Sequence, residues 1–249
     1  ITELSIADEQ LSNDGTVKLA FKLHDGKVVE GVLIPANDRM TACISSQVGC
    51  SLTCKFCATG KLKRMRNLDP DEIFDQASTI NLQSKLYYNR PISNIVFMGM
   101  GEPLLNYKNL ILGIEKITGK DGLGISPKRI TVSTSGISKL IIKMADENVK
   151  FNLAISLHSA LEKTRNKIMP FSKKFPLDEL KEAVKYWYKK TRKKVTYEYI
   201  VWKEINDDMK HIKALVKFCK ASPSKVNLIE YNNTENSFFT AAKDKIIQE

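Results

Sequence analysis

Three cysteines within one short stretch carry the most distinctive chemistry of this sequence. Cys50, Cys54 and Cys57 follow the spacing C-x3-C-x2-C, and Phe56 stands directly before the last of them. Three thiolates in one loop can bind three irons of a cubane 4Fe-4S cluster. The fourth iron then lacks a protein ligand and can bind the amino and carboxylate groups of S-adenosylmethionine. The pattern therefore predicts a radical source, in which the protein orients the cofactors and the cofactors carry the chemistry.

A zinc site and a disulfide framework are the alternative interpretations of these cysteines. Structural zinc usually takes four ligands, often from two C-x2-C pairs. Here a single pair stands beside one offset cysteine, and His158 and His211 lie far away in the sequence. Secreted disulfide domains are short and rich in cysteine, whereas this chain has five cysteines in 249 residues. Zinc stays open as the weaker alternative.

The chain carries a formal net charge of +11, with 39 Lys and Arg residues against 28 Asp and Glu residues. Such an excess indicates a polyanionic partner, most often nucleic acid, although well-solvated lysine-rich helices produce the same composition. The positive residues gather in two places, directly after the cysteines and beside an aromatic stretch: Lys61, Lys63, Arg64 and Arg66, and Lys189, Lys190, Arg192, Lys193 and Lys194. The first group is placed to hold phosphates near the radical source, and the second is equally compatible with a solvated helix end.

Hydrophobic residues make up 43% of the chain, which is enough for one large domain with a small extension. No apolar signal segment opens the sequence, and no apolar run approaches the ~20 residues that span a bilayer. We therefore expect a soluble, cytoplasmic protein without a membrane partner, in a compartment where thiols stay reduced.

The order of the expected elements predicts an α/β fold. Residues 16–35 read as a β-hairpin with its turn at Asp25 and Gly26. From Met40 onward, short apolar runs alternate with amphipathic helical stretches, the first of which starts at Asp69 and Pro70. The six strand-like runs are Met40–Ile44, Ser93–Met98, Arg129–Thr134, Phe151–Leu157, Val195–Trp202 and Lys225–Tyr231. The later helical stretches are Asn106–Ile117, Ser138–Glu147, Leu177–Lys190 and Asp207–Cys219. Alternation of this kind predicts right-handed βαβ units in a partial (βα)6 barrel over residues 39–249, with a β-hairpin extension over residues 1–38.

In such a barrel, ligands bind at the carboxyl ends of the strands, so residues that follow each strand are candidates for the site. The cysteine loop follows the first strand. The later strands are followed by Met98–Pro103, Ser133–Gly136, Ser156–His158 and Tyr231–Asn233. Glu102 is suited to a cofactor amine, and the small hydroxyls at 133–135 to a carboxylate or a ribose. A lone His158 is more often structural. Cys43 is expected near the cluster as an extra ligand, a catalytic thiol or a small buried residue, and Cys219 in the core with Ile212, Leu215 and Val216.

Five segments together resemble the radical-SAM RNA adenine methyltransferases of the RlmN type. They are CISSQVGCSLTCKFCATG at 43–60, FMGMGEPLLNY at 97–107, STSGI at 133–137, AISLHSA at 154–160 and VNLIEYN at 226–232. The resemblance covers nearly the whole chain. It implies methylation of carbon 2 of an adenosine in the peptidyl-transferase centre of 23S rRNA, and of the adenosine next to the tRNA anticodon. It also implies an electron donor such as flavodoxin or ferredoxin and a monomeric enzyme.

The resemblance implies a role for each matching residue. Cys50, Cys54 and Cys57 would bind the 4Fe-4S cluster. Glu30 would accept the proton, although without the resemblance it is an ordinary solvated strand residue. Cys43 would resolve a covalent RNA–protein adduct. That adduct arises because carbon 2 is electrophilic, so the methyl group first moves to a second cysteine, and a disulfide between the two cysteines later frees the product. The S-adenosylmethionine contacts would be Gly101, Glu102, Ser133, Ser156, Leu157, His158 and Asn232.

The printed sequence departs from that family at both ends. The family carries the methyl group on a cysteine in an A-C-G-Q-L-like segment, and Cys219 does not match that position. The helical N-terminal domain of the family is also absent. We expect this chain to bind cluster and cofactor but not to methylate RNA by itself. The alternatives are a Cfr-type enzyme acting on carbon 8, an inactive RNA-binding core, and a radical-SAM enzyme acting on a peptide or small molecule. The segments GEPLLN and STSG favour carbon 2.

Overall fold

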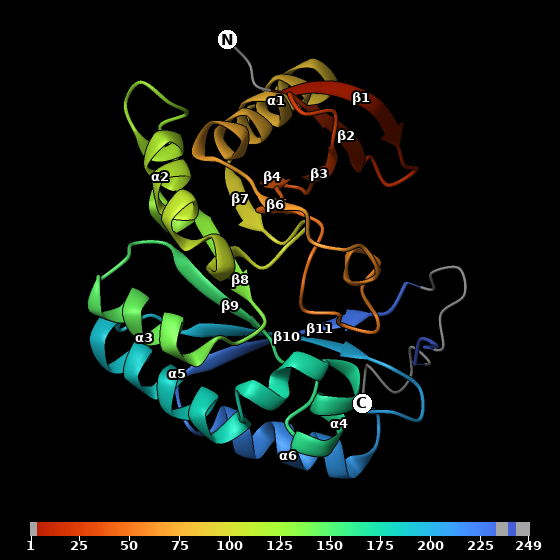
Figure 1. The fold of residues 1–249 in the computed structure, drawn as a ribbon, viewed down its shortest axis with the longest axis vertical. Coiled ribbons are helices and arrows are strands. Elements are labelled where there is room, and N and C mark those ends of the chain that lie inside the picture. Colours follow the sequence, from red (N-terminus) through yellow and green to blue (C-terminus); the bar gives the residue numbers. More distant parts are fainter. Residues whose placement is uncertain (1–3, 233–238, 243–249) are drawn as a thin grey trace. The chain divides into compact units, whose positions relative to one another are not determined.

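The computed structural model describes residues 4–232 and 239–242, which form two compact units (Figure 1). Among these residues, the first unit contains those numbered up to 51 together with Leu62–Ser133 and Lys150–Asn152, and the second contains Leu52–Lys61, Thr134–Val149 and those from 153 onward. The cysteine loop therefore contributes to both units, with Cys50 in the first and Cys54 and Cys57 in the second. The predicted domain boundary after residue 38 stays a prediction.

The sheet of the first unit runs in the order β1-β2-β3-β4-β7-β8. Its strands are β1 (Leu4–Leu11), β2 (Val17–Leu23), β3 (Val28–Pro35), β4 (Met40–Cys43), β7 (Asn94–Phe97) and β8 (Ile130–Thr134). Pairing is antiparallel from β1 to β4 and parallel from β4 to β8. The predicted hairpin is confirmed as β2 and β3. Strand β1 is not predicted, because its sequence lacks a regular apolar alternation and most of its side chains are exposed.

Helix α1 (Pro70–Tyr88) begins where the sequence predicts, at a capping box. The Asp69 carboxylate accepts from the Glu72 amide at 2.9 Å, and the Glu72 carboxylate accepts from the Asp69 amide at 3.1 Å. Helix α2 (Tyr107–Thr118) packs on α1 through Gly113, since a Cβ there would lie 2.7 Å from Ile73 Cγ2. The shorter elements of this unit are β5 (Gln47–Val48), β6 (Arg66–Asn67), η2 (Pro103–Asn106) and η3 (Pro127–Arg129).

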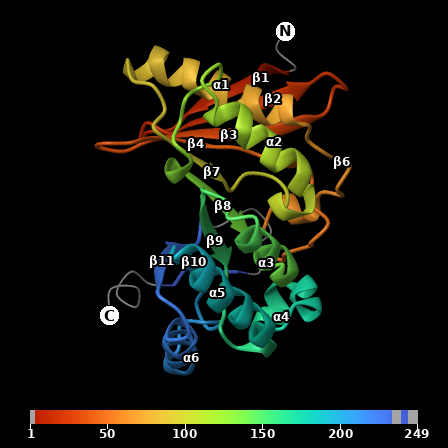
Figure 2. The same cartoon turned by 90° about the vertical axis from the view of Figure 1, so that its left-hand side faces the viewer.

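The second unit contains three parallel strands, β9 (Asn152–Ser156), β10 (Val195–Val201) and β11 (Ser224–Glu230). Its helices are α3 (Ser138–Asp146), α4 (Glu162–Ile168), α5 (Leu177–Thr191) and α6 (Met209–Cys219), with the shorter turns η1 (Thr59–Lys61) and η4 (Pro170–Lys174). Helices α3 and α5 lie side by side (Figures 1 and 2). All six predicted parallel strands are confirmed, and so are all the predicted helices. The seven-residue α4 is not predicted, because it is too short for a clear helical periodicity.

Helix α6 corrects one expectation about burial. Ile212 and Val216 are exposed, whereas His211 and Phe218 are the buried residues of this helix. Cys219 is only partly buried, so its predicted place in an apolar core with Ile212 and Val216 is wrong. In the described residues, no helix is both long and apolar enough to cross a membrane.

Candidate functional site

The second and third cysteines stand at the two ends of a tight turn in the second unit. The Cys57 amide donates to the Cys54 carbonyl at 3.2 Å, and the Gly60 amide donates to the Cys57 carbonyl at 3.1 Å. A Cβ at Gly60 would lie 2.6 Å from the Cys54 carbonyl oxygen, so the backbone closes tightly around Cys54. Thr53, directly before it, has a left-handed φ of 52°. Such strained backbone is typical of functional loops.

The three thiols fit a 4Fe-4S cluster by their chemistry. All three cysteines are partly exposed, and none of the five cysteines, which all lie in the described part of the chain, is joined in a disulfide. No group of three or more His, Cys, Asp or Glu side chains within residues 4–232 and 239–242 is already arranged around a metal position. The fit therefore rests on donor type, spacing and access rather than on a preformed ligand triangle.

The cysteine loop packs against the rest of the second unit through an aromatic cluster. This cluster consists of Phe56, His158, Trp202, Tyr231 and Phe239. The Phe56 ring lies edge-on to His158, with 4.8 Å between ring centroids, and 5.1 Å from Trp202. Trp202 in turn contacts Tyr231 and Phe239 at 5.9 and 5.1 Å. Phe56, directly before Cys57, is partly buried by these contacts, and its packing stabilises the turn that carries Cys54 and Cys57.

In the first unit, the loops that follow β4 and β7 are bonded to each other. The Ser46 and Gln47 amides donate to the Met100 carbonyl at 2.9 and 3.2 Å, and the Met100 amide donates to Ser45 Oγ at 2.8 Å. Gly101 has a φ of +97°, and a Cβ on it would lie 2.5 Å from Gln47 Cβ. The glycine therefore lets two strand-end loops approach each other at backbone distance.

Glu102, the predicted partner of the cofactor amine, is buried in the same unit. Its amide donates to Gln47 Oε1 at 2.9 Å, and its Oε1 accepts from the Leu104 amide at 3.1 Å. The carboxylate therefore caps η2 while it stands at the end of β7. Ser133, at the end of β8, is also buried.

Strand register places Glu30 and Cys43 on the same face of the first sheet. Cys43 pairs with Val32, and Glu30 stands two residues before Val32, so all three side chains share a face. The Glu30 carboxylate is half exposed and forms an ion pair with Lys18, with Nζ 2.7 Å from Oε1. An exposed carboxylate and a thiol are thus diagonal neighbours across two strands.

The Cys43 thiol is buried, and this burial raises its pKa from 9.0 to about 11, against a smaller opposing effect of the Met98 backbone. Because thiolate is the reactive form, burial keeps this cysteine protonated and unreactive at neutral pH.

The raised pKa of the Cys43 thiol predicts how the unfolding free energy of the protein depends on pH. A raised pKa stabilises the folded state fully below pH 9, and the contribution is lost as the pH rises toward 11. Between pH 8 and pH 10.5, the metal-free protein should lose ~2 kcal/mol more unfolding free energy than its Cys43→Ala variant. Urea unfolding of both proteins at the two pH values measures the difference. Equal losses in the two proteins would contradict it.

A polar row crosses the strands of the second unit. Ser156, Glu198 and Asn227 are register partners on β9, β10 and β11, and Asn227 Nδ2 donates to Glu198 Oε2 at 2.7 Å. Burial raises the pKa of Glu198, and the Asn227 hydrogen bond opposes this effect. The Glu198 carbonyl accepts from the Leu157 and His158 amides. Of the predicted residues, Ser156, Leu157 and His158 are therefore held together by β10.

His158 is fully enclosed in the second unit. Its Nδ1 accepts from the Ile200 amide at 3.2 Å, and its φ is 52°. Burial and then the positive charge of Arg165 lower its pKa to about 3, so the ring is neutral at physiological pH. Asn232 is exposed, and Asn233 lies outside the described residues.

The structure gives Arg66 a structural role that the basic pattern did not suggest. Its guanidinium bonds both oxygens of the buried Glu72 carboxylate at 2.7 Å and also binds Asp25 at 2.7 Å. These two carboxylates raise the pKa of Arg66, and Asp25 has its pKa lowered mainly by Arg66 and then by Lys27. The guanidinium thus ties the β2–β3 turn to the start of α1. The expectation that Arg66 contacts phosphate loses its support, while Arg64 stays exposed.

We expect Arg66→Gln to lower the unfolding free energy by ~2 kcal/mol, because it leaves the Glu72 carboxylate buried without its main partner. Arg64→Gln is the matched control and should change stability by less than ~0.5 kcal/mol. Thermal melting measures both effects. If Arg66→Gln instead flattened the salt dependence of RNA binding at unchanged stability, the structural role would be wrong.

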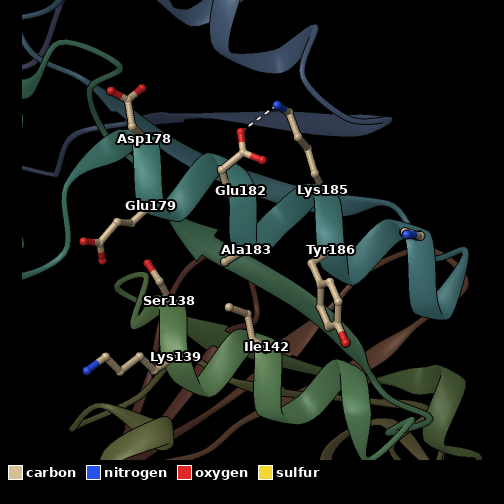
Figure 3. A pocket seen from close by; sticks show the side chains of 10 residues that line it. Ser138, Lys139, Ile142, Asp178, Glu179, Glu182, Ala183, Lys185 and Tyr186 are labelled. Carbon is tan, nitrogen blue, oxygen red and sulfur yellow. Dashed lines mark hydrogen bonds and ion pairs between the residues drawn. The ribbon is translucent and has the colours of Figure 1, made fainter.

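An open groove of about 840 Å³ lies between α3 and α5 (Figure 3). Ile142 and Ala183 face each other across it, and Glu182 and Lys185 form an ion pair at its rim at 2.6 Å. The groove contains none of the predicted cofactor-binding or catalytic residues.

Several polar residues of the two units were missed by the sequence analysis. Gln47, Asn106 and Gln76 bond the loops after β4 and β7, and Glu198 and Asn227 form the polar row. Gln47 and Asn106 stand inside segments already singled out, so a side-chain amide in a glycine-containing strand-end segment was an available signal. Glu198 had no such signal, because a charged residue inside a strand normally faces solvent.

These features define the class of protein. The sequence matches the Radical SAM superfamily over residues 44–216. A radical SAM methyltransferase from Sphaerobacter thermophilus has a structure with a TM-score of 0.96 and 34% identity, which covers 100% of this chain and 73% of that one. Streptococcus suis SuiB, solved with S-adenosylmethionine, shares the fold at a TM-score of 0.57 and 17% identity, over 81% of this chain and 44% of that one. The predicted radical-SAM barrel and its cofactors, a 4Fe-4S cluster and S-adenosylmethionine, are confirmed.

Relatives with higher sequence identity identify the family to which the chain belongs within this superfamily. A probable dual-specificity RNA methyltransferase RlmN from Flavobacterium psychrophilum is 64% identical over 99% of this chain and 71% of the relative. The Christiangramia forsetii protein of the same name is 60% identical over 97% of this chain and 69% of that relative. The chain belongs to the RlmN family of radical SAM RNA methyltransferases.

Proposed function

We propose that the protein methylates carbon 2 of an adenosine in the peptidyl-transferase centre of 23S rRNA and of the adenosine 3′ to the tRNA anticodon. The observation that carries this proposal is the 64% identity to an RlmN relative over 99% of this chain. The shared sheet face of Glu30 and Cys43 supports it, because the reaction needs a base and a thiol beside one adenine.

The proposed roles of the metal- and cofactor-binding residues are those that the family resemblance implies, and their places after the strands are compatible with them. Cys50, Cys54 and Cys57 hold the cluster, which supplies the electron that generates a radical from S-adenosylmethionine. In the first unit, Gly101, Glu102 and Ser133 contact that cofactor. In the second unit, Ser156, Leu157, His158 and Asn232 do so. The neutral His158 ring, enclosed by the aromatic cluster, positions the loop rather than transferring a proton.

Glu30 and Cys43 act on the RNA. The half-exposed Glu30 carboxylate is accessible to a macromolecular substrate and takes the proton from the modified ring. The Cys43 sulfur then attacks the sulfur of the methyl-carrying cysteine, so that an S–S bond forms while the bond from that sulfur to the RNA-bound carbon breaks. That carbon takes up a proton and leaves on the RNA as the methyl group. Because the Cys43 thiol is protonated at neutral pH, its proton must leave as the S–S bond forms, and the departing carbon is the group that takes up a proton in the same step.

Mapping the methylated nucleoside by mass spectrometry tests the function. The gene's full-length product, reduced under anaerobic conditions with S-adenosylmethionine and unmodified RNA, should yield 2-methyladenosine. Formation of 8-methyladenosine would contradict the proposal and favour a Cfr-type enzyme. RNA binding without any methylation would favour an inactive RNA-binding core. Flavodoxin or ferredoxin as electron donor, a monomeric state and the inactivity of the 249-residue chain alone stay predictions.

A further inference from the structure

Arg165 of α4 is a fully buried arginine with a large unmet capacity for hydrogen bonds. Its exposed fraction is 0%, and Nη2 donates to the Ser135 carbonyl at 2.6 Å. Within the described residues, Nε and Nη1 are buried and make no hydrogen bond. A guanidinium has five N–H donors and no acceptor, and a buried charge is normally compensated by an anion. The second unit therefore holds a buried cation whose free donors call for a negative group.

The surroundings of Arg165 identify the side of the site that it serves. Helix α4 carries the cysteine loop, because the Lys55 amide donates to the Ile168 carbonyl at 3.0 Å. Cys54 and Phe56 pack against the hydrophobic cluster that contains Ile168 and Met169, and the Met169 amide donates to the Arg165 carbonyl. Arg165 thus stands about one helical turn before Ile168 and Met169, which belong to the cluster against which Cys54 packs.

The pKa of Arg165 agrees with a position of its guanidinium near Cys54. Burial lowers the pKa of Arg165 to about 10, while the negative charges of Glu162 and Cys54 raise it in part. The side chain therefore stays charged at neutral pH. Glu162 is exposed, and its Oε2 accepts from the Leu177 amide at 2.8 Å. Cys54, which is partly buried in the same unit, is the other negative group that acts on the guanidinium. The close approach of Gly136, where a Cβ would lie 3.2 Å from Nη2, keeps the guanidinium in place.

We propose that Arg165 is a positioning residue for the iron–sulfur group, and that its Nε and Nη1 hydrogens donate to the anionic sulfurs held at Cys54. This inference rests on the proposed cluster-binding role of the three cysteines. One-electron reduction adds a negative charge to the cluster, and a fixed cation beside it stabilises the reduced form. Loss of the guanidinium should therefore lower the reduction potential of the cluster.

The test is a redox titration of the reconstituted, full-length protein, followed by electron paramagnetic resonance, with and without S-adenosylmethionine. Arg165→Gln removes the charge, and Arg165→Met replaces it should the glutamine variant not fold. Lys167→Met is the matched control, because it removes an exposed positive charge from the same helix. Melting curves and iron content establish that each variant is folded and loaded.

At a fixed potential without S-adenosylmethionine, the charge-removing variant should show an approximately tenfold lower ratio of reduced to oxidised cluster, which corresponds to about 59 mV. The control should match the unsubstituted protein. An unchanged potential in a folded, loaded variant would overturn the inference. A shift seen only with S-adenosylmethionine would also overturn it, because the guanidinium would then face the cofactor carboxylate. Absence of iron from the unsubstituted protein would instead contradict the proposed cluster site itself.

Discussion

Cys54→Ala should abolish both cluster binding and radical formation. Cys54 lies at the first position of the tight turn that ends at Cys57, and its backbone is enclosed by Gly60. The adjacent thiols of Cys50 and Cys57 are themselves required as cluster ligands, and the Cys43 thiol is buried, so we expect none of them to replace it. Iron content and 5′-deoxyadenosine formation after dithionite reduction should fall by more than ~100-fold, since even outer-shell changes around metals cost about 10- to 100-fold.

Cys219→Ala is the control for this experiment, because it removes a partly buried thiol from α6. It should retain iron and 5′-deoxyadenosine formation at nearly the original level. If the unsubstituted protein contained zinc instead of iron, or if Cys54→Ala still produced 5′-deoxyadenosine, the cysteine loop would not be a radical source.

Gly101→Ala should destabilise the first unit and weaken cofactor binding. The new Cβ would lie 2.5 Å from Gln47 Cβ and 2.9 Å from the Gln47 amide nitrogen, at a φ of +97°. Overpacking and left-handed backbone strain add, so we expect a loss of ~3 kcal/mol in unfolding free energy. The loop after β4 must also move, and S-adenosylmethionine binding should weaken at least tenfold.

The variant Gly26→Ala distinguishes backbone strain from steric overpacking as the cause of the expected stability loss. Its φ is +77°, but no atom lies within 4 Å of the added Cβ. This control therefore carries strain without a clash, and should cost only ~1 kcal/mol with no effect on cofactor binding. Urea unfolding and calorimetric titration of both variants measure the effects. Equal stability losses would mean that the approach of Gly101 to Gln47 is not a close contact.

The sequence was sufficient for the parts of the fold that follow from local chemistry. The capping box at Asp69, the turn at Asp25 and the alternation of apolar runs with helices specified α1, the β2–β3 hairpin and all six parallel strands. Strand β1 could not be predicted, because its pairing with β2 depends on tertiary contact rather than on its own pattern. Helix α4 is too short for its periodicity to be recognised.

For the candidate site, the sequence predicted which residues stand at strand ends, but not which groups their side chains contact. Strand-end logic identified Glu102 and Ser156, but it could not show that the first carboxylate caps η2 or that the second residue shares a row with Glu198. Arg66 and Arg165 illustrate the limit most clearly. Both are basic residues in a basic chain, yet one is bound by two carboxylates and the other is buried. Only the folded structure distinguishes them from solvated charges.

The aromatic cluster has a thermodynamic consequence for the chain beyond β11. Phe239 packs on Trp202, which also contacts Phe56 of the cysteine loop, and the Lys203 amide donates to the Thr240 carbonyl at 3.0 Å. The ordering of the segment at 239–242 and the ordering of the cysteine loop therefore share one set of contacts. By linkage, any ligand that stabilises the loop increases the docked population of this segment, and docking of the segment increases affinity at the loop by the same factor.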